Sequence, residues 1–175
     1  MDTRPALSVT ISLSEAGPGL PESPGDLTPI LPDGGRPLAP ELTVPGLPSQ
    51  ARPVRRYLHD LTAGLPVAAA HAVWLGSELF ANAVLHSRSG DPGGTVTVGV
   101  YEWPDRIRVR MVDDGPRAES PGGPHVRPLD LAEPGGLGLR VVSLKAARWG
   151  VDHPGDGCTG VWFDLDSTGR PRGGR

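Results

Sequence analysis

Apolar residues recur along the chain with two periods, and the change of period separates predicted helices from predicted strands. Helical spacing first appears between residues 49 and 64, where the apolar positions are Val54, Tyr57, Leu58 and Leu61. Ser49 suits the N-cap and Gly64 suits the C′ position. The pattern therefore predicts a helix that begins near Ser49, runs to Gly64 and buries one face.

A second helix is predicted from about Pro66 to about Ser87, because helical spacing resumes there. Its apolar residues lie on more than one side: Val73, Phe80 and Val84 on one, Leu75 and Leu79 on another. A helix that is apolar on most sides belongs in the centre of a domain.

Strict alternation then replaces the helical period in TVTVGVYEW (95–103) and RIRVRMV (106–112). Two alternating runs separated by Pro-Asp predict a hairpin, whose second strand ends at Asp113. Ile107, Val109 and Met111 are expected to point inward. The three arginines between them, Arg106, Arg108 and Arg110, are expected to form a solvated strand face.

Residues 114–136 are mostly turn-forming, and loops of this length are usually functional lids or disordered. A third helix is predicted over roughly 137–149, with Gly150 as its stop, followed by strands at 151–153 and 160–166. The buried candidates of that helix are Leu139, Val142, Leu144 and Ala146. The order of elements predicts an α+β two-layer sandwich with a mixed, mostly antiparallel sheet and helices on one face.

Proline is concentrated at the start of the chain, where ten of the 21 prolines fall within the first 50 residues. Residues 1–40 are therefore expected to be a largely disordered segment. Within it, ALSVTISL (6–13) is a strand candidate that could add to a sheet edge. The folded domain is expected over 41–166, with 167–175 as a flexible basic tail.

The net charge of −3 and the pI near 5.9 give no general attraction to nucleic acid or to an anionic membrane. The single cysteine, Cys158, excludes an internal disulfide and offers no metal cluster. No apolar run is long enough to cross a bilayer, and the N-terminus lacks a signal-peptide core. A cytoplasmic protein is expected.

Glu78 and Asn82 interrupt the central helix within SELFANAVLHS (77–87). Four residues turn a helix by about 400°, so both side chains leave the same face. Buried polar groups need a partner, and an amide oxygen suits Mg²⁺, whereas a carboxylate can orient or deprotonate a nucleophile. The alternative is that both side chains bond to neighbouring backbone.

Two further segments carry candidate chemistry. Asp113, in Val-Asp-Asp-Gly, can accept a hydrogen bond from a planar amine, or it can form a plain Asx turn. The segment Gly-Gly-Leu-Gly-Leu (135–139) opens the third helix, where glycines and free N–H groups suit an anion. A Gly-rich hinge is the alternative there. Neither a Walker P-loop nor a dinucleotide fingerprint fits this segment.

The tracts WLGSELFANAVLHS, DDG, GLGLRVV and RWGV…TGVWFDL, taken in order, resemble the GHKL ATPase superfamily over residues 41–166. That superfamily includes the ATP-binding domains of histidine kinases. Within it, the compact layout is similar to the anti-sigma-factor serine kinases. This resemblance implies ATP and Mg²⁺ as cofactors.

The resemblance also implies a role for each matching residue. Glu78 matches the general base or orienting carboxylate, and Asn82 the Mg²⁺ ligand. Asp113 matches the aspartate that recognises the adenine amine. The remaining nucleotide-binding positions are Gly115 at the base pocket, Gly136, Leu137, Gly138 and Leu139 at the phosphates, and Thr159 at the adenine. Pro116 and Arg117 depart from the family pattern and would stiffen the start of the lid.

Three functions follow as hypotheses. The first is a serine/threonine kinase that phosphorylates an anti-anti-sigma partner, with a homodimer implied by the family. The second is a non-catalytic, nucleotide-dependent module that sequesters a sigma factor or another regulator. The third is an ATPase accessory to a separate sensor. His59, which resembles a phosphoacceptor histidine, is interpreted instead as a surface residue of the first helix.

Overall fold

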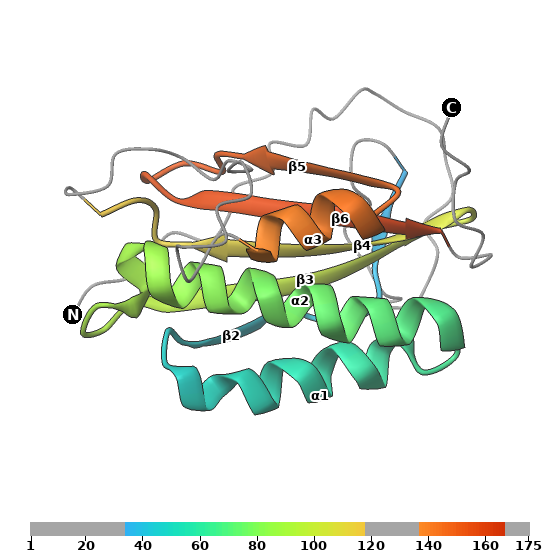
Figure 1. Cartoon of the computed structure of the whole chain (residues 1–175), viewed down its shortest axis with the longest axis horizontal. Coiled ribbons are helices and arrows are strands. Elements are labelled where there is room, and N and C mark those ends of the chain that lie inside the picture. The colour runs from blue at the N-terminus through green and yellow to red at the C-terminus, as the bar shows by residue number, and fades with distance from the viewer. Residues whose placement is uncertain (1–33, 118–136, 167–175) are drawn as a thin grey trace, which may run out of the picture.

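The computed structural model describes residues 34–117 and 137–166, which form a helical layer packed on one face of a β-sheet (Figure 1). The helical elements are η1 (Pro48–Gln50), α1 (Ala51–Thr62), α2 (Pro66–His86), η2 (Arg88–Gly90) and α3 (Leu137–Lys145). The strands are β1 (Arg36–Pro37), β2 (Leu42–Pro45), β3 (Thr95–Trp103), β4 (Arg106–Asp113), β5 (Arg148–Asp152) and β6 (Thr159–Asp166). The predicted α+β two-layer class is confirmed.

The sheet has the order β1-β3-β4-β6-β5, and β2 also pairs with β3. All pairings between the described strands are antiparallel, which agrees with the expectation of a mostly antiparallel sheet. The predicted hairpin forms from β3 and β4, in which Trp103 pairs with Arg106 across a two-residue turn. Ile107, Val109 and Met111 are buried, as the alternation predicts.

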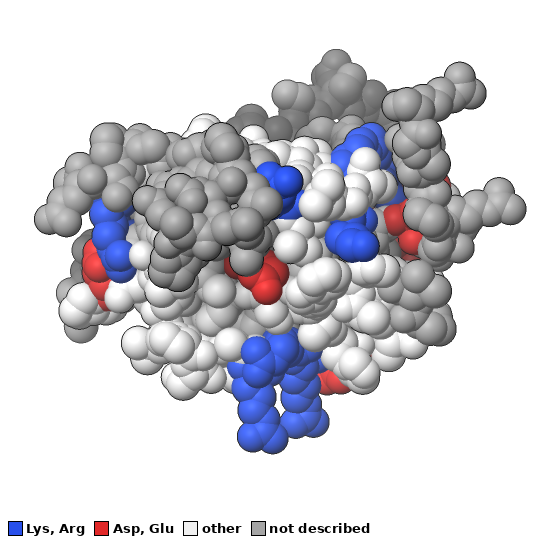
Figure 2. Space-filling view, in the orientation of Figure 1, with Lys and Arg blue, Asp and Glu red and all other residues white. Residues whose placement is uncertain are grey.

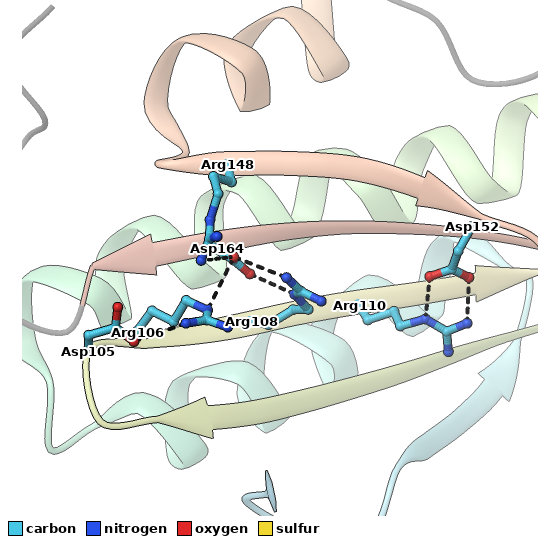
Figure 3. A network of polar contacts seen from close by, with 7 residues as sticks. All are labelled: Asp105, Arg106, Arg108, Arg110, Arg148, Asp152 and Asp164. Carbon is cyan, nitrogen blue, oxygen red and sulfur yellow. Dashed lines mark hydrogen bonds and ion pairs between the residues drawn. The ribbon is translucent and has the colours of Figure 1, made fainter. Parts of the chain in front are cut away.

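The expectation of a solvated arginine face is wrong. Figure 3 shows that Arg106, Arg108 and Arg110 lie along the face of the sheet opposite the helices and reach acidic residues on β5 and β6. Only 18–20% of each arginine side chain is exposed. Their alkyl stems cover the sheet, and their charged ends form ion pairs. The alternation of polar and apolar residues in the sequence does not reveal these ion pairs.

The central position predicted for the second helix is confirmed. Residues on several sides of α2 are buried, among them Leu75, Leu79 and Phe80. α1 packs beside it through Val54 and Leu58, and α3 packs through Val142. α2 is therefore the element around which both neighbouring helices and the sheet assemble.

Two helix boundaries differ from the prediction. Ser49 lies inside η1, and α1 begins at Ala51 after Gln50, which caps it without a side-chain hydrogen bond. α3 ends at Lys145 rather than near 149, because residues 148–152 form a ladder with β6. Gly150 is consequently a strand residue, not a helix stop. Leu144, a predicted core residue, is 70% exposed.

The described structure also begins earlier than the domain start expected at residue 41. β1 pairs with β3, and a Cβ at Gly35 would overlap the ring of Trp103. The strand candidate at 6–13, most of the lid and the tail at 167–175 lie outside the described residues. None of the helices in the described ranges is long and apolar enough to cross a membrane.

Candidate nucleotide-binding site

Glu78 and Asn82 lie one turn apart on α2, which is the longest helix of the described chain. Both side chains are half-buried rather than fully buried. Their face of the helix lies next to the exposed stripe that carries Trp74 and Leu85, while Leu75 and Leu79 turn toward the core. Glu78 and Asn82 are therefore held by a buried helix but remain open to a ligand.

Neither side chain forms a hydrogen bond or an ion pair with any residue in the described ranges. By contrast, the neighbouring Ser77 donates its hydroxyl to the carbonyl oxygen of Val73 at 2.7 Å. The sequence left open that Glu78 and Asn82 form hydrogen bonds with nearby backbone. The described residues show no such hydrogen bonds. Their polar atoms are available for an external partner.

Asp113 occupies the last inward position of β4, following Ile107, Val109 and Met111 on the helix side of the sheet. A carboxylate in a core position is costly, and Asp113 is only 9% exposed. Its Oδ1 accepts a hydrogen bond of 2.7 Å from the Gly115 amide, which is the Asx turn considered from the sequence. That turn leaves the second carboxylate oxygen without a hydrogen bond to the described residues.

Burial raises the pKa of Asp113 to about 6, despite the Gly115 amide, which lowers it. The nearby Asp114 raises this pKa further, and Arg88 lowers it. A pKa near 6 means that Asp113 is ionised at neutral pH but carries a desolvation cost. An aspartate in this state is well suited to accept a hydrogen bond from an amine.

Thr159 lies directly opposite Asp113 in the pairing of β4 with β6, and it is 3% exposed. Opposed residues of an antiparallel pair carry their side chains on the same face, so Thr159 and Asp113 are neighbours. Strand register therefore brings together Asp113 and Thr159, the two residues predicted to contact the adenine base, and their surroundings are called the base site below.

Gly115 is required for two reasons. Its φ is +85°, a conformation that favours glycine, and an added Cβ would overlap the carbonyl oxygen of Gly157. Gly157 belongs to the turn that leads from β5 into β6. Two loops, one after Asp113 and one before Thr159, thus meet at Gly115 with no space for a side chain.

The predicted phosphate segment is described only in part. Gly136 lies outside the described residues, as does the preceding lid from residue 118. Leu137 and Gly138 form the first positions of α3, and Leu139 is half-buried against the core. The start of α3 supplies backbone N–H groups without intrahelical partners, which suit a phosphate.

Sequence reasoning missed a polar cluster that joins the end of α2 to the end of β4. The Ser89 hydroxyl donates to the Thr95 carbonyl at 2.5 Å and accepts from the Asp114 amide at 2.8 Å. The Asp114 carboxylate accepts from the Thr95 amide at 2.8 Å. The only sequence signal was a Ser-Arg-Ser-Gly run after a helix, which is typical of many ordinary turns.

His59 and His86 both have exposed side chains. His59 lies on α1, and its Nδ1 is 3.2 Å from Oδ1 of Asp60. Its exposure agrees with the interpretation of His59 as a surface residue. His86 is exposed at the last residue of α2.

A magnesium ion fits the donor set of this site. No group of three or more His, Cys, Asp or Glu side chains within 34–117 and 137–166 is arranged to hold a metal. Mg²⁺ does not need such a cage, because it commonly takes one or two protein oxygens and completes its shell with water and phosphate. The half-buried amide oxygen of Asn82 could supply one of these ligands.

Comparison with known proteins agrees with this geometry. A family model described as a histidine kinase-like ATPase domain matches residues 44–163, which is more than half of the chain. No curated protein matches the chain. The matched range contains α2, the end of β4, the start of α3 and most of β6, so it includes Glu78, Asn82, Asp113 and Thr159. The chain belongs to the histidine kinase-like ATPase family, whose domain binds ATP.

Proposed function

We propose that this chain is a Mg²⁺-dependent protein serine/threonine kinase of the anti-sigma-factor type, which transfers the γ-phosphate of ATP to a regulatory partner. The observation that carries the proposal is the pair Glu78 and Asn82. A buried helix presents both side chains on one face, and neither is satisfied by the described residues. A domain that only bound nucleotide would have no need of the carboxylate.

In this reaction, Asp113 and Thr159 bind the adenine base and thereby orient the nucleotide. Asn82 would hold Mg²⁺, which would neutralise charge on the phosphates. Glu78 accepts the proton of the partner's Ser or Thr hydroxyl while the hydroxyl oxygen forms a bond to the γ-phosphorus. The bond from that phosphorus to the β–γ bridging oxygen breaks, so that the products are ADP and a phosphorylated partner.

Exposed apolar residues support a protein partner. Trp74 is 45% exposed and Leu85 is 61% exposed, and 11 residues separate them, about three turns along one face of α2. In Figure 2, a basic group projects from the lower edge of the molecule, where Figure 1 shows α1. The exposed arginines of α1 are Arg52, Arg55 and Arg56. An apolar surface beside basic residues suits a partner with an apolar, acidic segment.

A non-catalytic, nucleotide-dependent binding module is the second candidate. Arg117, at the start of the lid, donates to the Leu85 carbonyl at 2.8 Å and pairs with Asp91 at 3.1 Å. Pro116 stiffens the preceding residue, and a bridge joins it to Ser87. A lid fixed at its first residues favours slow closure, and slow closure favours binding over turnover.

The first experiment is calorimetry of ATP binding with and without Mg²⁺. Asn82→Ala should weaken binding only when Mg²⁺ is present. Glu78→Ala should bind Mg²⁺-ATP as wild type does but lose phosphotransfer from γ-labelled ATP to a Ser/Thr-containing partner. Ser77→Ala is the matched control, because its hydroxyl is already bonded within the helix. Wild-type binding without any transfer would favour the second candidate, and a Mg²⁺-independent effect of Asn82→Ala would remove the assigned metal role.

A further inference from the structure

Arg88 is the first residue of η2, directly after the end of α2, and it contacts the base site with both its backbone and its side chain. Its amide donates to the Gly115 carbonyl at 2.9 Å. Its Nε donates to the Asp114 carbonyl at 2.8 Å, and its Nη2 contacts the same oxygen. Nη2 also lies 3.4 Å from the Gly157 carbonyl. One residue therefore reaches three backbone carbonyls.

These carbonyls belong to the two loops that end at the base site. Asp114 and Gly115 directly follow Asp113, and Gly157 precedes Thr159 by two residues. The Gly157 carbonyl already packs against the Cα of Gly115, and Nη2 would lie only 3.2 Å from a Cβ added there. Three carbonyl dipoles gathered in one place repel one another, and the guanidinium charge offsets that repulsion.

Arg88 also acts on the charge of Asp113. In the described residues, two charged groups influence that carboxylate: Asp114 from the loop after β4, and Arg88 from the turn after α2. Asp114 favours the neutral acid, and Arg88 favours the carboxylate. Because only the carboxylate accepts hydrogen bonds at both oxygens, Arg88 favours the form that recognises an amine.

We propose that Arg88 is a positioning residue for recognition of the adenine base, because it fixes the Asp114–Gly115 loop against Gly157 and so holds in place the Gly115 amide that is bonded to the Asp113 carboxylate. The proposal rests on the nucleotide binding described above. It assigns Arg88 two separable contributions. The planar fork holds the loops, and the positive charge lowers the pKa of Asp113, against the larger effect of burial, which raises it.

Two substitutions separate these contributions in the full-length chain. Arg88→Gln removes the charge and most of the fork, whereas Arg88→Lys keeps the charge and loses the fork. Arg36→Gln is the matched control, since the Arg36 side chain is 69% exposed on β1 and its ion pair within the described residues is with Glu102 at 2.9 Å. Affinities for ATP and GTP are measured by calorimetry from pH 5 to pH 8, and folding of each variant is checked by circular dichroism.

Wild-type ATP affinity should rise with pH as Asp113 ionises. Arg88→Gln should weaken ATP binding about tenfold at neutral pH, move the midpoint of that rise to higher pH and reduce the preference for ATP over GTP. Arg88→Lys should lose affinity several-fold and leave the midpoint in place. The control should match wild type in every measurement.

The outcomes distinguish this proposal from the proposed function. Absence of ATP binding in wild type would overturn the function itself. Wild-type binding together with an Arg88→Gln variant of unchanged affinity, midpoint and base preference would overturn the role of Arg88 alone. If Arg88→Gln binds ATP more weakly but keeps the pH midpoint and the preference for ATP over GTP, Arg88 is merely structural, and this outcome would also overturn its proposed role. If Arg88→Gln does not fold, Arg88→Lys decides, because an unchanged affinity in that variant contradicts the role of the fork.

Discussion

Asp164 and Asp113 are buried aspartates on neighbouring strands, and they differ in how their charge is satisfied. Asp164, on β6, is fully buried on the outer face and meets Arg108 at 2.7 Å and Arg148 at 3.2 Å (Figure 3). Arg106 lies 3.5 Å from the same carboxylate. Asp113, on the inner face, accepts one backbone hydrogen bond and forms no ion pair with the described residues.

This difference separates a structural charge from one that we propose binds a ligand. The partners of Asp164 are all supplied by the chain, so its carboxylate is complete without a ligand. Asp113 retains a desolvation cost that raises its pKa to about 6, and a ligand can offset that cost. The comparison can be tested by removing each charge in turn.

The largest effect is expected from Asp164→Asn. Arg108, whose side chain is 18% exposed, would lose the carboxylate that accepts its two hydrogen bonds, and Arg106 would lose one of its two acidic neighbours. The free energy of unfolding should fall by about 3 kcal/mol, measured by urea denaturation. Asp152→Asn is the matched control: Asp152 is 40% exposed, and among the described residues its ion pair is with Arg110 alone, so a loss of about 1 kcal/mol is expected. Equal losses in the two variants would contradict the distinction.

Asp113→Asn should have the opposite sign. Because the pKa of Asp113 is raised from 3.8 to about 6 on folding, its contribution to stability is fully present below about pH 4 and is lost as pH rises through 6. The asparagine variant should avoid that loss and exceed wild type by about 2 kcal/mol at pH 7, while the two converge near pH 4.

The same variant should bind ATP more weakly, because an amide offers the adenine amine a weaker acceptor than a carboxylate. Denaturation curves at pH 4, 5, 6 and 7 test the expected gain in stability, and ATP titrations test the expected loss of affinity. A variant that is no more stable than wild type at pH 7 would show that the ionised Asp113 carries no such cost.

Gly115→Ala tests whether the two loops at the base site are in contact. Gly93 offers a matched control, since its φ is +83° and nothing lies within 4 Å of an added Cβ, whereas an added Cβ at Gly115 meets Gly157. Both variants lose about 1 kcal/mol from the backbone conformation. Gly115→Ala should lose about 1 kcal/mol more and also weaken ATP binding. Identical melting curves for the two variants would argue against the contact.

The smallest effect is expected from Arg56→Gln, which removes the exposed pair with Asp60 on α1. Surface pairs of this spacing contribute about 0.3–0.5 kcal/mol, and salt screens them. A thermal melt at low and high salt should show a small difference that disappears at high salt. A loss comparable to that of Asp164→Asn would mean that burial does not decide the strength of these ion pairs.

The sequence predicted those features that depend on local period. The helical face of Val54 and Leu58, the bounds of α2 to within a residue, and the inward row of Ile107, Val109 and Met111 all follow from spacing. The prediction that α2 and the end of β4 contribute residues to one site did not come from spacing. It came from the order of the motifs, which resembles that of a known family.

The sequence could not predict features that depend on contacts between distant residues. Arg148 and Trp149 fit a helix pattern, but pairing with Asp164 and Phe163 draws them into β5. The arginines of β4 alternate as solvent-facing residues do, yet they form ion pairs with Asp164 on β6 and Asp152 on β5. Arg88 carries no signal of its own, since its role depends on two loops that meet only in the folded chain.

The outer strands of the sheet also have a consequence for association between molecules. On one side, β3 is covered by two short strands, β1 and β2, instead of a single long one. On the other side, β5 bears Arg148 and Asp152 at its ends. Short or charged edges are poor templates for further strands. The edges that the described strands form are thus protected against edge-to-edge aggregation.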